Sequence, residues 1–144
     1  MKLAFYRGTG NWIQKLIKLR TNSDFCHVEL LFSDGTTFSA DLGQGVRFTN
    51  GKQINAKDWE IIDLQNGEPE ALKLWCKSIN GQKYDLWGNL ELGFGRGDVD
   101  KDKWFCSELC LTALQQFFNL FTWMKPGDTS PQDLWIACKA YLQK

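Results

Sequence analysis

The sequence predicts a single α+β domain, spanning residues 1–144, in which an antiparallel sheet packs against helices. Two observations predict this class. Short strand-like runs separated by glycine turns fill the middle third of the chain. Helical stripes of apolar residues follow in the second half. A chain of this length buries roughly two-thirds of its unfolded surface in one core, and no linker, repeat or low-complexity tract divides it.

Composition narrows the functional classes. The formal net charge is zero, so no basic surface for nucleic acid is expected. No apolar run approaches the roughly 20 residues that cross a bilayer. Within residues 1–7 the apolar run is interrupted by charge too early for a signal peptide. We therefore expect a cytoplasmic protein whose five cysteines are reduced thiols. Seven tryptophans and ten phenylalanines indicate an aromatic core or, alternatively, an apolar cleft or lipid-facing surface.

Strand-like runs dominate the first half of the chain. They cover residues 3–7, 25–32, 36–42, 46–48 and 59–64. Asp34 and Gly35 form a strong hairpin signal between the second and third runs. The middle third is accordingly predicted to be an antiparallel meander.

Four helices are predicted from apolar periodicity and capping residues. They cover residues 11–20, 70–80, 106–118 and 131–142. Pro69 with neighbouring acids opens the second helix and Gly81 ends it. Ser130 and Pro131 open the last one as N-cap and first helical residue.

The start of the third helix carries the most chemistry. Cys106 lies at a helix N-terminus, where the dipole and free backbone N–H groups stabilise a thiolate and can hold an oxyanion. Ser107 and Glu108 occupy the same first turn. His27, the only histidine, lies on a predicted strand and is the one candidate base. The alternative is that Cys106 and His27 are ordinary structural residues.

Several blocks, taken in order, resemble a known family. They are FCHVEL at 25–30, DG at 34–35, FSA at 38–40, GVR at 45–47, GQKYD at 81–85, WFCSEL at 104–109 and SPQDL at 130–134. This set is similar to circularly permuted papain-like cysteine hydrolases, the YiiX-like branch of the NlpC-type superfamily, related to lecithin:retinol acyltransferase. The histidine precedes the cysteine here, which is the reverse of the order in papain.

The resemblance implies a permuted papain-like fold, with Cys106 as nucleophile and His27 as base. In that family a third residue, often glutamate, comes from the strand after the histidine and orients the imidazole. Ser39 stands at that place, Asp41 shares its strand face, and the two are equal candidates. Glu29, on the face of His27, follows closely. 

The oxyanion would be held by the backbone N–H of Cys106, with Tyr6 as a possible second donor on resemblance only. Ser107 is a further oxyanion or cleft-lining candidate.

Metal sites do not fit the sequence. Cys26 and His27 are adjacent on a strand and point to opposite faces, so they cannot share a zinc ion. Residues 98–102 resemble a calcium loop, but Lys103 stands where the glycine belongs. No metal or other cofactor is expected.

The predicted function is a cysteine hydrolase, of the peptidase or amidase type, that cleaves an amide or ester acyl bond through a thioester on Cys106. Its substrate would be a small-molecule, peptide or lipid-like acyl compound. Two alternatives stay open: a lipid-directed thioesterase or acyltransferase, which the tryptophans suit, and a non-catalytic binding module on the same fold, which Ser39 suits.

Overall fold

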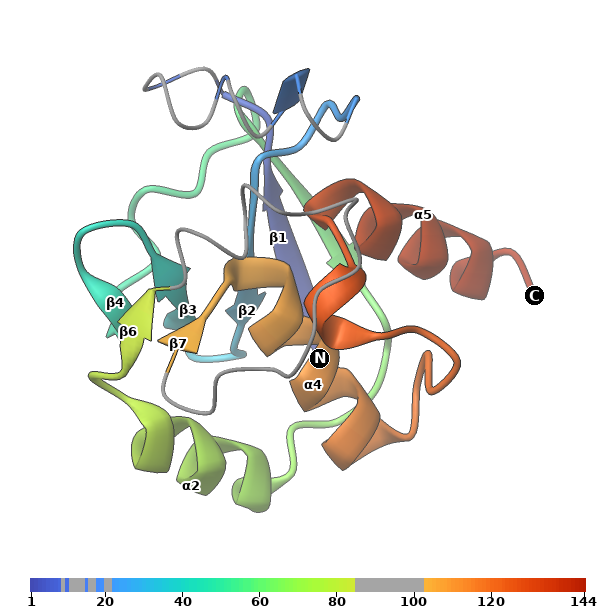
Figure 1. The fold of residues 1–144 in the computed structure, drawn as a ribbon. Coiled ribbons are helices and arrows are strands. Elements are labelled where there is room, and N and C mark those ends of the chain that lie inside the picture. Colours follow the sequence, from blue (N-terminus) through green and yellow to red (C-terminus); the bar gives the residue numbers. More distant parts are fainter. Residues whose placement is uncertain (9, 11–14, 16–17, 20–21, 85–102) are drawn as a thin grey trace.

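In the computed structural model, which describes residues 1–8, 10, 15, 18–19, 22–84 and 103–144, a five-stranded antiparallel sheet packs against three α-helices (Figure 1). The strands of the sheet are β1 (Lys2–Tyr6), β2 (His27–Leu31), β3 (Thr37–Asp41), β4 (Gly45–Thr49) and β5 (Trp59–Asp63). The helices are α2 (Glu70–Ile79), α4 (Cys106–Phe118) and α5 (Pro131–Leu142). Shorter elements are β6 (Lys83–Tyr84), β7 (Lys103–Trp104) and the 3-10 turn η1 (Pro126–Asp128). The predicted α+β class is confirmed.

The sheet has the order β4-β3-β2-β1-β5, with every pair antiparallel. Strands β2, β3 and β4 are adjacent in sequence order, as the meander predicted for the middle third of the chain requires, and β1 lies on the other side of β2. The fifth strand corrects the prediction, because β5 returns to the opposite edge and pairs with β1 rather than with β4. The central position of β2 follows from this order, and β2 begins with His27.

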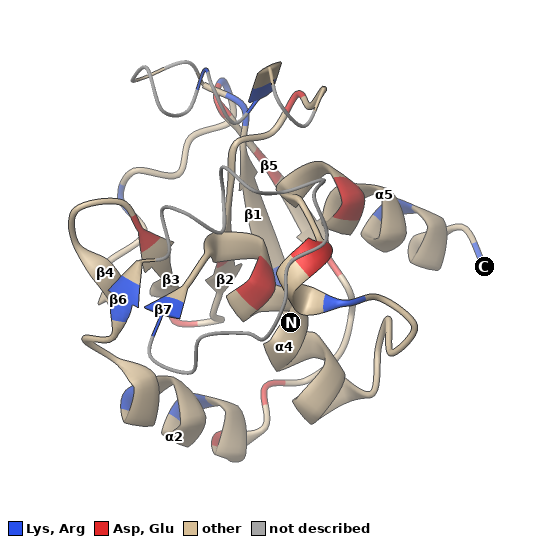
Figure 2. Cartoon of the chain, viewed as in Figure 1, with Lys and Arg blue, Asp and Glu red and all other residues tan. Residues whose placement is uncertain are grey.

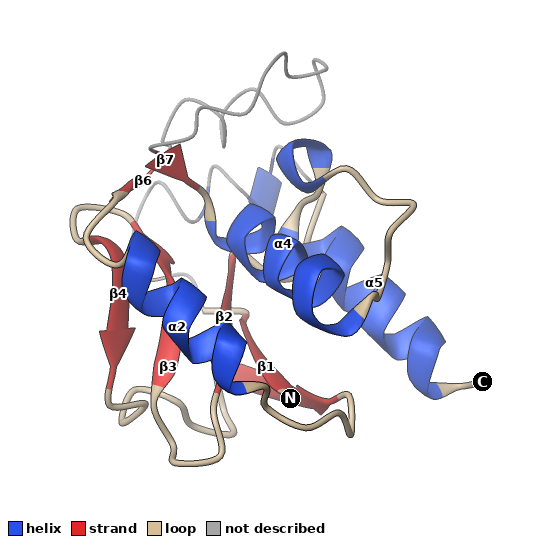
Figure 3. Ribbon diagram, turned by 90° about the horizontal axis from the view of Figure 1, so that it is seen from below, coloured by secondary structure: helices blue, strands red, loops and turns tan. Residues whose placement is uncertain are grey.

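The helices lie next to one another. α2 and α5 each contact α4, which packs on β2 and β3 (Figure 3). Opposite residues of an antiparallel pair share a face, so Leu3 and Phe5 of β1 lie on the same side as Leu30 and Val28 of β2. These four side chains are fully buried, in one apolar core with Leu109 and Leu114 of α4. The other face of the sheet carries His27, Glu29 and Tyr6.

Local capping signals locate the helices well. α4 begins at Cys106, and the N–H of Phe105 donates to the Glu108 carboxylate. Ser130 and Asp133 form a reciprocal capping box at the start of α5, with Pro131 in the first turn. Figure 2 shows the acidic residues in the first turns of both helices. In α2, Pro69 is the N-cap and Gly81 follows the C-cap with φ +89°, as the sequence predicts for its two ends.

Two predictions fall largely on residues that the structure does not describe. These are the helix over residues 11–20 and the charged loop over residues 95–103. Within the described part of the chain, no helix is both long and apolar enough to cross a membrane.

Candidate active site

Cys106 and His27 lie together at one end of the sheet. His27 is the first residue of β2 and Cys106 is the first residue of α4, which packs on β2. The Cys106 side chain hydrogen-bonds with the His27 imidazole. Nε2 of His27 is engaged by Glu29. Cys106 itself is only 1% exposed, whereas the side chain of His27 is 13% exposed.

Glu29 is the carboxylate that contacts the imidazole. Nε2 of His27 donates to Oε1 of Glu29 at 3.0 Å, and the side chain of Glu29 is only 4% exposed. The two residues are two positions apart on one strand, so their side chains emerge on the same face. A buried carboxylate there fixes the ring orientation and favours the imidazolium. The structure therefore joins Cys106, His27 and Glu29 in one contact chain.

The pKa values within this chain move in opposite directions. Burial alone would lower the pKa of His27, but hydrogen bonds to Cys106 and Glu29, together with their negative charges, raise it well above 6.5. Burial would raise the pKa of Glu29, yet its hydrogen bond to His27 and the charge of the imidazolium lower it below 4.5. Both shifts favour an ion pair between His27 and Glu29.

The other two candidates for the orienting role have other partners. Ser39 is buried and its hydroxyl donates to the backbone carbonyl of Val28 at 2.7 Å. Asp41 accepts a hydrogen bond from Nη2 of Arg47 at 2.5 Å. Both side chains are thus occupied within the sheet, and Glu29 alone of the three makes a described hydrogen bond to His27.

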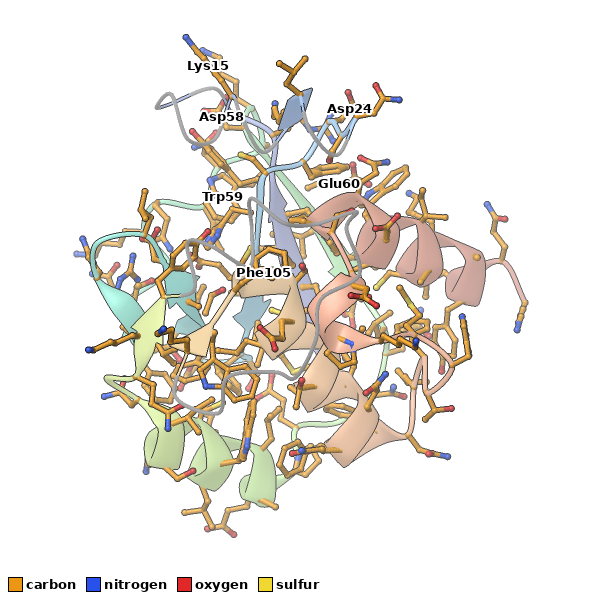
Figure 4. All side chains as sticks on the ribbon, in the orientation of Figure 1. Lys15, Asp24, Asp58, Trp59, Glu60 and Phe105 are labelled. Carbon is orange, nitrogen blue, oxygen red and sulfur yellow. The ribbon has the colours of Figure 1, made fainter. Side chains whose placement is uncertain are left out.

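A cavity of about 530 Å³ opens on the face of the sheet that carries His27. Its lining residues come from β1 to β5 and the loops around them: Tyr6, Gly10, His27, Glu29, Asp41, Arg47, Thr49, Gln53, Asn55, Asp58 and Trp59. The rings of Tyr6 and Trp59 lie 4.9 Å apart between centroids, and Trp59 also meets His27 edge-on. Figure 4 shows Asp58 and Trp59 where β5 begins and Phe105 where α4 begins. Polar groups dominate this cavity.

Tyr6 and Ser107 occupy different environments. Tyr6 lines the cavity, and burial raises the pKa of its phenol, so the hydroxyl stays a donor at neutral pH. Ser107 is fully buried, and its hydroxyl donates to the carbonyl of Thr129. That bond anchors the first turn of α4 to the segment before α5, and Ser107 does not line the cavity beside His27.

Three residues near the site were not identified from the sequence. Gln53 Nε2 donates to Oε2 of Glu29 at 3.1 Å, and the charge of Arg47 contributes to the low pKa of Glu29. Tyr84 pairs with Trp104 between β6 and β7, and burial followed by the charge of Cys106 raises its pKa. The only sequence signal for Gln53 is the Asn50-Gly51 turn, which predicts a turn but not its position in space.

No group of three or more metal-ligating side chains, counting His, Cys, Asp and Glu, is close enough to hold an ion among the described residues. The thiols of Cys26 and Cys106 therefore have no metal partner set in that part of the chain, and all five cysteines are free.

Comparison of the chain with protein-family models and with curated proteins gave no match.

Proposed function

We propose that the chain is a cysteine hydrolase with a permuted papain-like arrangement, which cleaves an amide or ester acyl bond. The observation that carries the proposal is the contact chain from Cys106 through His27 to Glu29. A thiol nucleophile needs a base within hydrogen-bonding reach, and the base needs a third group that orients it. The start of α4 adds the backbone N–H groups of a helix N-terminus, which can hold an oxyanion.

Each residue then has a defined step. His27 carries the proton of the Cys106 thiol as an imidazolium paired with Glu29, and the sulfur attacks the acyl carbon to form a C–S bond. The N–H of Cys106 holds the resulting oxyanion, and His27 returns the proton to the leaving amine or alcohol. Water, deprotonated by His27, hydrolyses the thioester, releases the acid and restores the thiol. Glu29 stabilises the imidazolium that forms in both half-reactions.

The cavity beside His27 favours a polar, amide-containing substrate. Its lining includes the side chains of Thr49, Gln53 and Asn55, which offer hydrogen bonds, and the aromatic rings of Tyr6 and Trp59. Such a lining suits a peptide-like compound better than an acyl chain, because an alkyl chain would remove these polar groups from water without offering them new hydrogen bonds.

A lipid-directed thioesterase or acyltransferase is the second candidate. A neighbouring cavity of about 430 Å³ shares Asn55 and Trp59 with the first and includes Ile54, Ala56 and Ile61. Ile61 is 49% exposed there, so an acyl chain would find apolar surface beside the polar cavity.

A non-catalytic binding module is the third candidate, because Cys106 is 1% exposed. Turnover would require the sulfur to become accessible to an acyl carbon.

One experiment separates the three candidates. The wild type, Cys106→Ala and the control Cys138→Ala would be incubated with peptide amides, short aryl esters and fatty-acyl thioesters, with product release and intact protein mass recorded. We expect turnover and a covalent acyl adduct in the wild type and in Cys138→Ala, with neither in Cys106→Ala. Preference for peptide amides supports the first candidate and preference for long acyl chains the second. Turnover by Cys106→Ala would contradict any cysteine mechanism, and inertness of the wild type would leave the binding module.

A further inference from the structure

The second oxygen of Glu29 has its own set of partners. Oε1 accepts from His27, while Oε2 accepts from Nε2 of Gln53 at 3.1 Å. The hydroxyl of Thr37 also hydrogen-bonds with this carboxylate. Both oxygens are therefore used, and the carboxylate cannot rotate about its axis without losing a bond. A carboxylate only accepts hydrogen bonds, so the NH₂ end of the Gln53 amide must face it.

The side chain of Gln53 is itself held in place. Its Nε2 donates to the hydroxyl of Thr49 at 3.0 Å as well as to Glu29, and the hydroxyls of Thr49 and Thr37 lie 2.6 Å apart. Thr37 and Thr49 are directly paired between β3 and β4. Gln53 thus spans from the edge strand β4 across β3 to Glu29 on β2.

The backbone of the β4–β5 loop is shaped to bring Gln53 to this point. Gly51 has φ +70°, and a Cβ on it would lie 2.1 Å from the carbonyl oxygen of Gly35. The loop consequently rests directly on the β2–β3 turn at a position where only glycine fits. Its first turn is closed by the bond from the Gly51 N–H to the Thr49 hydroxyl and by that from the Ile54 N–H to the Gly51 carbonyl.

We propose that Gln53 is a positioning residue of the candidate active site. It holds Glu29 in the orientation in which the carboxylate hydrogen-bonds with His27 and stabilises the imidazolium. Gln53 acts on the reaction through Glu29 and not by touching the reacting atoms. The inference rests on the proposed function for its effect on catalysis, but the effect on His27 is independent of any substrate.

The charged groups around His27 and Glu29 come from every neighbouring element. Cys106 faces the imidazole from α4, Arg47 acts on Glu29 from β4, and Asp41 is paired with Arg47. Tyr6 of β1 and Asp58 of the loop before β5 line the same cavity. Gln53 is neutral, so replacing it with a neutral residue leaves all these charges in place. A change in the titration of His27 would then report a change in geometry.

The test uses the single histidine of the chain. One imidazole signal can be followed by NMR as a function of pH, with no assignment problem, in the wild type, in Gln53→Leu and in the control Gln143→Leu. Gln143 is exposed at the end of α5, where only its backbone makes a described bond. In Gln53→Leu we expect the midpoint of His27 to fall toward 6.5 by about half a pH unit or more, because a hydrogen bond to a charged group is weakened. The midpoint in Gln143→Leu should equal that of the wild type.

Activity gives the second readout. Loss of a residue that orients a catalytic group typically costs roughly tenfold to a hundredfold, so kcat of Gln53→Leu should fall by about that factor with little change in KM. Gln53→Glu tests the donor directly: a carboxylate at this place repels Glu29, whereas its protonated form donates as the amide does. The kcat of Gln53→Glu should therefore approach that of the wild type as the pH is lowered.

The outcomes separate the two proposals. An unchanged or raised His27 midpoint in Gln53→Leu would overturn the positioning role, whatever the activity. A lowered midpoint, in a protein whose wild type hydrolyses none of the substrates, would support the positioning of Glu29 and contradict the hydrolase. If Gln53→Leu does not fold, the pH dependence of Gln53→Glu decides: a defect that persists unchanged at low pH contradicts the donor role.

Discussion

At the scale of single residues, the site depends on a buried acid and a buried base, each of which stabilises the charged form of the other. The side chain of Glu29 is 4% exposed and that of His27 is 13% exposed, and each alone would be neutral in such a place. Together they form an ion pair with a 3.0 Å hydrogen bond. The pair therefore links the stability of the fold to pH as well as to the proposed chemistry.

Stability should change with pH in a defined direction. The pKa of His27 is raised above 6.5 by its bonds to Cys106 and Glu29, against the effect of burial, so its contribution is complete below pH 6.5 and is lost as the pH rises through the raised value. The pKa of Glu29 is lowered below 4.5 by His27, also against burial, so its contribution is present above pH 4.5 and is lost as the pH falls through the lowered value. 

We therefore expect Glu29→Gln to be destabilised most between pH 4.5 and 6.5, as measured by urea unfolding at a series of pH values. A difference from the wild type that stays constant with pH would contradict the ion pair.

The orienting residue can be identified by three substitutions. Glu29→Gln should lower kcat by about 10² to 10⁴, because the charge that stabilises the imidazolium is lost. Asp41→Asn should leave kcat near that of the wild type, since Asp41 is paired with Arg47. Ser39→Ala should cost about 1 kcal/mol of unfolding free energy through its lost bond to Val28, with kcat retained. Activity that survives in Glu29→Gln but falls in Asp41→Asn would reverse this assignment.

Thiol labelling should discriminate among the five cysteines. Burial raises the pKa of Cys26, Cys76 and Cys138 to about 12 and also raises that of Cys110. Cys106 instead hydrogen-bonds with His27 at the start of a helix. We expect iodoacetamide near neutral pH to modify Cys106 first, as mapped by mass spectrometry. Faster modification of Cys26 or Cys110 would identify a different nucleophile.

Sequence reasoning at this scale proposed Cys106 and His27 as a pair and included Glu29 as a candidate orienting residue, but it did not rank Glu29 first. Alternation along a strand places Glu29 on the face of His27. It does not say that Ser39 and Asp41 already have partners, because those partners are the backbone of Val28 and the side chain of Arg47 on β4. Such competition depends on strand pairing, which a single sequence does not specify.

At the scale of elements, local sequence rules located the helix starts but did not predict the contacts of the loop between β4 and β5. The starts of α4 and α5 follow from residues within one turn of the boundary. For this loop the sequence indicates only a turn at Asn50-Gly51, since the loop contacts Gly35 and Glu29, which are distant in the sequence. Contacts within a turn are encoded locally, whereas contacts between a loop and a sheet face are not.

Gly51→Ala tests the loop as an element. An added Cβ meets the Gly35 carbonyl at 2.1 Å, at a φ of +70°. We expect a loss of about 1–3 kcal/mol of unfolding free energy from the strained backbone and the displaced loop. Gly67→Ala is the control, because nothing lies within 4 Å of its added Cβ and its φ is not in the left-handed region. Equal stabilities of the two variants in urea unfolding would contradict the close approach of the loop.

At the scale of the whole molecule, the class was predictable and the strand order was not. Apolar periodicity and hairpin turns are sufficient for the α+β class and for the run from β2 to β4. Nothing in the residues of β5 distinguishes pairing with β4 from pairing with β1. The choice depends on which edge is free once the helices have packed, and β6 already lies beside β4, where the Val46 N–H donates to the Gln82 carbonyl.

The edge position of β5 has a consequence for the order in which the fold forms and opens. β5 joins the sheet only through β1, so Lys2 must find Asp63 across a long stretch of chain, which closes a large loop at an entropic cost. The hairpins β2–β3 and β3–β4 close over short turns, and we expect them to form earlier and to open later. Amide hydrogens on β5 should therefore exchange with solvent faster than those on β2. Each such opening would move Trp59 away from Tyr6 and His27. The cavity would therefore open transiently on this side while the contact of His27 with Cys106 remained intact.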